Sequence, residues 1–187
     1  MREGKARYVG VSNFSVLELA EMDRYRRIDT LQPPYSLFRR DIEHDILPYC
    51  RDREIGVLVY GPLAHGLLGG RMTADPKFPP GDWRSASPIF RGEPLRTNLA
   101  VVDRLRQLAE RRSHSLPQLA IAWTLAIPGI HVAIVGSHNP EHMPETVSAT
   151  DFELTPGELT EIESIMADAV PVGGPSPEGM PVTDSVS

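Results

Sequence analysis

The sequence predicts an α/β fold with a four-stranded parallel sheet, and two observations support this prediction. Short apolar segments alternate with segments of helical periodicity, which is the order in which crossover helices connect parallel strands. The clearest strand, 56–60, is a continuous apolar run, as expected for a parallel strand covered on both faces. The four expected strands lie at 8–12, 30–32, 56–60 and 131–135. The pattern alone leaves two architectures open, part of a (β/α)8 barrel and a small doubly wound sheet.

The helices between these strands are predicted from their caps. The segment from Ser15 to Glu18 has the form of a capping box and predicts a helix over about 16–25. Ser115 begins a second helix in the same way, and the pair Thr155-Pro156 opens the last one. Residues 42–50 have near-helical spacing that Pro48 makes irregular, and 61–94 is a long loop rich in Gly and Pro.

Composition excludes several classes of protein. The chain has 187 residues and a formal charge of -6, which argues against broad binding to nucleic acid or to an anionic membrane. We find no apolar run long enough to span a membrane and no apolar core of a signal peptide. Cys50 is the only cysteine, so we expect a reducing, cytoplasmic location. We expect one domain over 1–170 and a disordered Pro- and Gly-rich tail over 171–187.

Four segments in this order and spacing resemble the aldo/keto reductase family. They are 7–14 (RYVGVSNF), 32–36 (QPPYS), 60–70 (YGPLAHGLLGG) and 134–141 (IVGSHNPE), with 117–123 (PQLAIAW) before the last. The resemblance covers about residues 4–169. It implies that the strands are the fifth to eighth of a TIM barrel, so that the chain forms a partial (β/α)8 barrel of about four C-terminal strand–helix units.

The resemblance also implies a nicotinamide cofactor, NADP (NADPH). It assigns Ser12, Asn13 and Gln32 to the nicotinamide carboxamide and Tyr60 to stacking on the ring. These residue types suit the task, because a carboxamide needs hydroxyl and amide partners and a ring needs an aromatic face. All four stand at the C-terminal ends of expected strands, where barrel sites are built.

Two loops supply the remaining cofactor residues that the resemblance implies. They are Gly61, Pro62, Leu63, Gly66, Leu68 and Arg71 in the first loop, and Gly136, Ser137, His138, His142 and Glu145 in the second. Ser137 would bind the 2′-phosphate, at a strand end before a helix that suits an anion. Many relatives have a basic residue near 138 or 142, and histidine is a weaker phosphate clamp than arginine. We still predict NADP over NAD, and no metal site, since His138 and His142 lack a third ligand.

The family's catalytic Asp, Tyr, Lys and His all come from the first half of its barrel, and no residue of this chain matches them. We therefore expect an NADP-dependent oxidoreductase by family, acting on small carbonyl or alcohol substrates, whose isolated chain does not reduce carbonyls. The alternatives are a non-catalytic dinucleotide-binding or self-associating half-barrel, a subunit completed by a separate N-terminal half, and a truncated reading frame. The loop 72–94, with its aromatic residues, is expected to contribute a wall to a substrate pocket.

Overall fold

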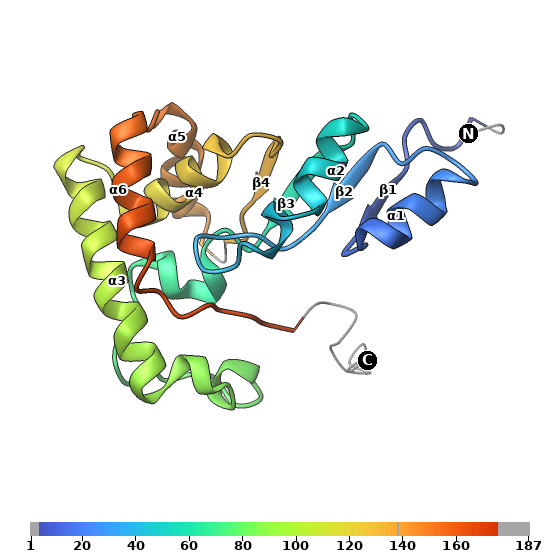
Figure 1. Cartoon of the computed structure of the whole chain (residues 1–187). Helices are drawn as coiled ribbons and strands as arrows, with labels where there is room; N and C mark the ends of the chain where they lie inside the picture. Colours follow the sequence, from blue (N-terminus) through green and yellow to red (C-terminus); the bar gives the residue numbers. More distant parts are fainter. Residues whose placement is uncertain (1–3, 138, 176–187) are drawn as a thin grey trace.

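Four parallel strands form one sheet in the computed structural model, which describes residues 4–137 and 139–175. The strands are β1 (Gly10–Ser12), β2 (Thr30–Gln32), β3 (Gly56–Tyr60) and β4 (Val132–Ile134), and they lie in the order β1-β2-β3-β4 (Figure 1). Neighbouring strands pair in parallel, with Ser12 opposite Gln32 and Tyr60 opposite Ile134. The α/β class and the parallel sheet predicted from the sequence are confirmed.

The helices lie between the strands and after β4. They are α1 (Val16–Asp23), α2 (Ile46–Asp52), α3 (Gly92–Arg111), α4 (Leu116–Ala126), α5 (Met143–Ser148) and α6 (Pro156–Met166). Reciprocal capping boxes begin α1 and α4, as predicted. A third capping box, which was not predicted, begins α6 at the expected pair Thr155-Pro156. Pro48 is accommodated because it occupies the first turn of α2, where its missing N–H has no intrahelical partner, and a separate 3-10 turn, Asp41–Glu43, precedes the helix.

One face of the sheet is buried under helices and the other is more open. Val57 and Val59 of β3 are fully buried, whereas Leu58 and Tyr60 between them are only partly buried. Val132 of β4 pairs with Leu58 and lies on the same face of the sheet. Its side chain is 42% exposed. The expectation that 56–60 is covered on both faces is therefore wrong. The physical reason is that, among the described residues, the helices cover the outer face and leave the inner face partly open.

The chain after α6 continues in contact with the core instead of leaving it at 171. Asn98, which is fully buried in α3, accepts a hydrogen bond from the Val170 N–H at 2.8 Å and donates one to the Val170 carbonyl at 3.0 Å. Val172 is 2% exposed, and its N–H donates to the carbonyl of Phe38 at 2.9 Å. We call residues 170–174 the C-terminal strap. Its order corrects the expected boundary of the tail, and 176–187 lie outside the described residues.

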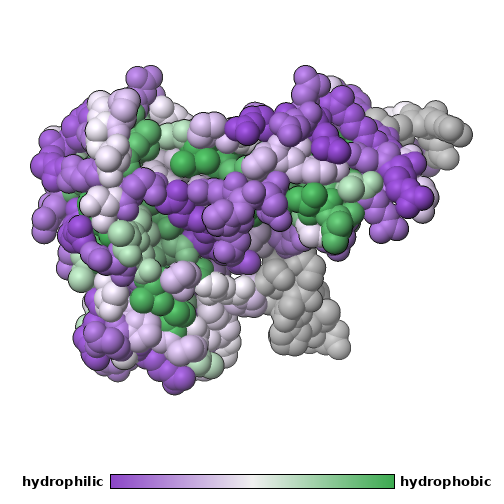
Figure 2. All heavy atoms as spheres, viewed as in Figure 1, coloured by the Kyte–Doolittle hydropathy of each residue, from purple (hydrophilic) through white to green (hydrophobic). Residues whose placement is uncertain are grey.

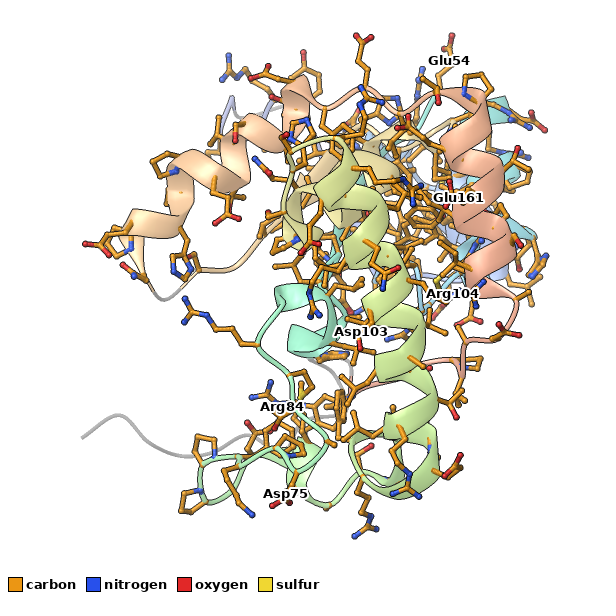
Figure 3. The ribbon with its side chains drawn as sticks, turned by 90° about the vertical axis from the view of Figure 1, so that its left-hand side faces the viewer. Glu54, Asp75, Arg84, Asp103, Arg104 and Glu161 are labelled. Carbon is orange, nitrogen blue, oxygen red and sulfur yellow. The ribbon has the colours of Figure 1, made fainter. Side chains whose placement is uncertain are left out.

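The long helix α3 lies beside α6, and ion pairs cross between them (Figure 3). Arg111 contacts Glu161 at 2.7 Å, and Arg104 contacts Asp168, just after α6, at 2.7 Å. These side chains are largely exposed, so each pair contributes on the order of 0–1 kcal/mol. Within 4–137 and 139–175, no helix combines the length and apolar character that crossing a membrane requires.

Candidate functional site

The carboxyl ends of β1 and β2 bring three of the predicted residues together. The Ser12 hydroxyl donates to the Gln32 carbonyl at 2.9 Å, and the Asn13 N–H donates to the same oxygen at 3.2 Å. Asn13 has a φ of 59°, a left-handed conformation that Asn adopts more readily than most residues. Two hydrogen bonds to one carbonyl fix how the two strands end, so the polar side chains of Ser12, Asn13 and Gln32 start from a common edge.

Tyr60 joins this group from β3, across the intervening strand β2. Its hydroxyl donates to the Asn13 side-chain oxygen at 3.0 Å. Its backbone N–H donates to the Pro33 carbonyl at 3.1 Å, so the chain is held just after β2 as well. The Tyr60 side chain therefore extends across the end of β2. The residue is held by hydrogen bonds at its backbone N–H and at its hydroxyl. We call Ser12, Asn13, Gln32 and Tyr60 the strand-end cluster.

A groove of about 550 Å³ lies beyond the cluster, between the loop after β3 and the connection from β4 to α5. Seven predicted cofactor residues line it: Leu63, Gly66, Arg71, Gly136, Ser137, His142 and Glu145. We call this cavity the loop groove. His138 lies outside the described residues.

Three other predicted residues lie outside the lining of the loop groove. Gly61 is exposed and turns the chain after Tyr60 with a φ of 74°. Pro62 and Leu68 are buried. The Leu68 N–H already donates to the Leu63 carbonyl at 3.2 Å. The structure thus brings neither the Pro62 nor the Leu68 side chain to the groove, because Pro62 is buried and Leu68 belongs to the hydrophobic core.

Positive charge in the loop groove comes from the loop after β3. Arg71 Nη2 lies 3.3 Å from His142 Nε2, so the two loops that line the groove are in contact here. Sequence reasoning missed two further cations that line the groove, Lys77 and Arg84. Each of these charges is paired with a carboxylate at 2.6 Å, Lys77 with Asp75 and Arg84 with Asp82. Among the described residues of the groove, Arg71 is the cation without a carboxylate partner.

The expected anion site at the end of β4 is not a helix N-terminus. A 3-10 turn, Pro140–His142, follows the strand, and its first N–H donates to the Asn139 side chain at 3.0 Å. The Ser137 hydroxyl donates to the Asn139 carbonyl at 2.8 Å. The side chains of Ser137 and Asn139 therefore stabilise this loop, and α5 begins only after the 3-10 turn, at Met143. The phosphate-binding role of Ser137 stays a prediction.

Aromatic side chains of the loop 72–94 pack together beside the site. Trp83 makes edge-to-face contacts with His65 and Phe90, with centroids 4.9 and 5.6 Å apart. The C-terminal strap packs against His65 and Trp83. Gly174 lies so close to the imidazole that a Cβ added at this position would be 2.3 Å from His65 Nε2. Burial, together with Arg39 and Arg84, lowers the pKa of His65, which favours a neutral imidazole. A small cavity lined by Tyr60, His65 and Val172 connects this wall to the strand-end cluster.

The architecture that these features define is part of a (β/α)8 barrel, with its site at the carboxyl ends of the strands. The solved structure of the glycerol dehydrogenase AKR11B4 from Gluconobacter oxydans is similar over 96% of this chain and 54% of that chain, with a TM-score of 0.86 and 36% identity. A partial barrel, and not a doubly wound sheet, is therefore the fold.

The chain belongs to the aldo/keto reductase family of oxidoreductases, because the family model matches residues 1–167. It is 36% identical to the aldo-keto reductase YhdN of Bacillus subtilis over 91% of this chain and 52% of that protein. It is 35% identical to the NADH-specific methylglyoxal reductase of Escherichia coli over 90% of this chain and 51% of that protein. The chain thus spans about half the length of these curated relatives. Within the described residues, no group of three His, Cys, Asp or Glu side chains could hold a metal ion.

Proposed function

We propose that the chain binds NADP, with the nicotinamide at the strand-end cluster and the phosphates in the loop groove. One observation carries the proposal: the cluster and the groove adjoin, because only Gly61 and Pro62 separate Tyr60 from Leu63, which lines the groove. The donor set fits the cofactor. The cluster offers amides, hydroxyls and an aromatic face, and the groove offers a cation that no carboxylate compensates among its described residues.

In this proposal the chain's residues bind and orient the cofactor, which supplies hydride transfer when it is bound. The Tyr60 ring covers one face of the nicotinamide, while Ser12, Asn13 and Gln32 hold its carboxamide. Arg71 and Ser137 contact phosphate oxygens, and the charge of Arg71 favours NADP over NAD. His142 and Glu145 lie on the adenosine side, where Glu145 is exposed.

The proposed reaction class is hydride transfer between NADPH and a small carbonyl or alcohol, with the His65–Trp83 wall facing the substrate. No residue of the chain matches the family's proton-donating group. General acid catalysis typically contributes about 10²–10⁴-fold, so we propose that the isolated chain binds the cofactor without turning over a carbonyl.

A fluorescence titration of the purified chain with NADPH and with NADH tests the proposal. We expect saturable binding that favours NADPH, and no oxidation of NADPH in the presence of an aromatic aldehyde. A folded sample that binds neither nucleotide would show that the site does not operate in this chain. Carbonyl reduction that survives stringent purification would contradict the absence of turnover.

The open inner face supports a second candidate function, association with a second copy or with a complementary half-barrel. Among the described residues, β1 and β4 each pair with a strand on one side only. On the inner face Val132 is 42% exposed and Ile134 is 37% exposed. Away from this face Leu17 is 82% exposed, and Figure 2 shows apolar surface near the start of α1. Light scattering on the eluting protein tests self-association, and a monomer at high concentration would contradict it.

A cytoplasmic location is a further proposal, which rests on cysteine usage. Burial raises the pKa of the Cys50 thiol to about 11, so this side chain serves packing and not thiolate chemistry. Fractionation of the source cells tests the location, and recovery of the protein outside the cytoplasm would contradict it.

A further inference from the structure

A left-handed turn forms part of the wall of the loop groove. Leu63 and Gly66 line the groove, and the Gly66 N–H donates to the Leu63 carbonyl at 3.0 Å, which closes the turn. The two residues between them, Ala64 and His65, have φ angles of 48° and 56°. This conformation brings the Cβ of a residue close to a carbonyl oxygen, so it persists only where surrounding contacts enforce it. We therefore looked for a contact that holds the turn from outside.

Arg84, from the loop 72–94, makes such a contact. Its Nη1 donates to the His65 carbonyl at 2.8 Å. The guanidinium also packs tightly against the turn, because a Cβ added at Gly66 would lie 3.3 Å from the same nitrogen. A hydrogen bond from a charged donor is among the stronger ones, so it can keep the His65 carbonyl where the left-handed turn places it.

The Arg84 side chain is itself held in place. Asp82 accepts from its Nε at 3.0 Å and from its Nη2 at 2.6 Å, and the guanidinium lies 4.6 Å from the centre of the Phe78 ring. The side chains of Arg84 and Asp82 are 27% and 15% exposed. The charge of Arg84 is thus already paired, while its Nη1 is directed at the turn. This arrangement suits a residue that positions the backbone better than one that binds a phosphate by charge.

We propose that Arg84 is a positioning residue of the dinucleotide site, which keeps the turn 63–66 in the shape that the loop groove requires. The inference rests on the proposed dinucleotide function and deepens it. In the proposed binding mode the phosphates lie in this groove, so the shape of its wall affects NADPH and NADH alike. Arg84 then acts through the backbone of His65, in contrast to Arg71, whose charge is proposed to contact phosphate directly.

Arg84→Lys in the full chain tests this role while keeping the charge. An ammonium group can pair with Asp82, but it lacks the fork that reaches Asp82 and the His65 carbonyl together. We expect the Kd values for NADPH and NADH, measured by fluorescence titration, to rise together by about threefold or more, the fold-change of one ordinary hydrogen bond. Arg91→Lys is the matched control, because the exposed Arg91 donates to the Ala86 carbonyl at 3.3 Å, outside the turn, and should leave both Kd values unchanged.

A glycine substitution in the turn provides a rescue that a loss of charge would not allow. Glycine adopts positive φ about as readily as negative φ, so Ala64→Gly should let the turn keep its shape without the Arg84 contact. We expect it to restore most of the affinity of the Arg84→Lys chain for both nucleotides and to change the wild-type Kd values little. Ala86→Gly is the matched control, because Ala86 has a φ of -90°, so this substitution should not restore the affinity.

Thermal unfolding of the wild type, both single variants and the double variant measures the coupling without a ligand. We expect Ala64→Gly to be less destabilising in the Arg84→Lys chain than in the wild type, because the two positions share one contact. The Ala64 side chain is buried. If loss of its methyl group prevents folding, His65→Gly takes its place at the second left-handed position.

Three results would overturn the inference when the wild type binds NADPH: unchanged Kd values in Arg84→Lys, a loss confined to NADPH, or a glycine rescue that is absent or no better than that of Ala86→Gly. If the wild type binds neither dinucleotide, the proposed function fails and the positioning role fails with it. The unfolding measurements then still report whether Arg84 holds the turn, which separates the two failures.

Discussion

The strand-end cluster is held by hydrogen bonds between its own members, whereas the loop groove is formed by two exposed loops. Asn13 is bound to Tyr60 and to Gln32 at 3.0 and 3.2 Å, on strands whose register is fixed by the sheet. In the groove, Arg71 and His142 meet across one contact of 3.3 Å between exposed or partly buried side chains. The first region is therefore suited to recognition by geometry and the second to recognition by charge. The two should respond differently to mutation, salt and pH.

The largest effect is expected from Tyr60→Ala, which removes both the ring and the anchor of Asn13. We expect the affinities for NADPH and NADH to fall equally, by about tenfold or more, because in the proposed binding mode this region does not contact the 2′-phosphate. Tyr25→Ala, at a position 79% exposed after α1, is the control in the same titration. A loss of affinity for NADPH alone would contradict the proposal that the strand-end cluster binds the nicotinamide and the loop groove binds the phosphates.

A smaller and selective effect is expected from Arg71→Ala. The affinity for NADPH should fall about fivefold, a value reduced for solvent screening, while that for NADH changes little. Added salt should weaken NADPH binding less in the variant than in the wild type, because fewer charge contacts remain to be screened. Arg96→Ala is the control, since Arg96 pairs with Glu93 on the exposed side of α3. Equal losses for both nucleotides would show that Arg71 does not read the 2′-phosphate.

The smallest effect is expected from pH, at the His65–Trp83 wall. Because burial, Arg39 and Arg84 lower the pKa of His65, the unfolded or opened segment binds the proton more readily. The closed wall is therefore fully stable above the ordinary histidine pKa of about 6.5 and loses stability as pH falls from there toward the lowered pKa.

The fluorescence of Trp83, measured in a Trp123→Phe background, reports the separation of Trp83 from His65. We expect acidification below about pH 6.5 to change the emission, and His65→Gln to remove the change. His44→Gln, at an exposed position, should leave it intact. A transition that persists in the His65 variant would assign it to another group.

Local signals predicted much of the fold, and long-range contacts account for what they missed. Ser15 with Glu18 and Ser115 with Gln118 lie within one turn of each other, so the sequence predicted their helix starts. Val172 lies in a stretch without periodicity, and its burial depends on Phe38, far away in the chain. Local sequence cannot show such a contact.

The same contrast applies to the candidate site. The residues of the strand-end cluster end predicted strands, so the sequence predicted that they would lie close together at one edge. Family resemblance then supplied their roles, which stay predictions. Arg84 reaches the groove through a folded loop in which it contacts Asp82 and the His65 carbonyl. Its only sequence signal was a cation within a long Gly- and Pro-rich loop.

Sequence separation gives the two regions different places in the assembly of the chain. Ser12 and Gln32 meet across 20 residues, whereas Arg71 and His142 meet across 71. Closing the longer loop costs about 1 kcal/mol more in chain entropy, because the cost grows with the logarithm of length. During synthesis from the N-terminus, every residue of the strand-end cluster has emerged once Tyr60 has left the ribosome. The loop groove needs β4 and α5, so a nascent chain can complete the proposed nicotinamide site well before the proposed phosphate site.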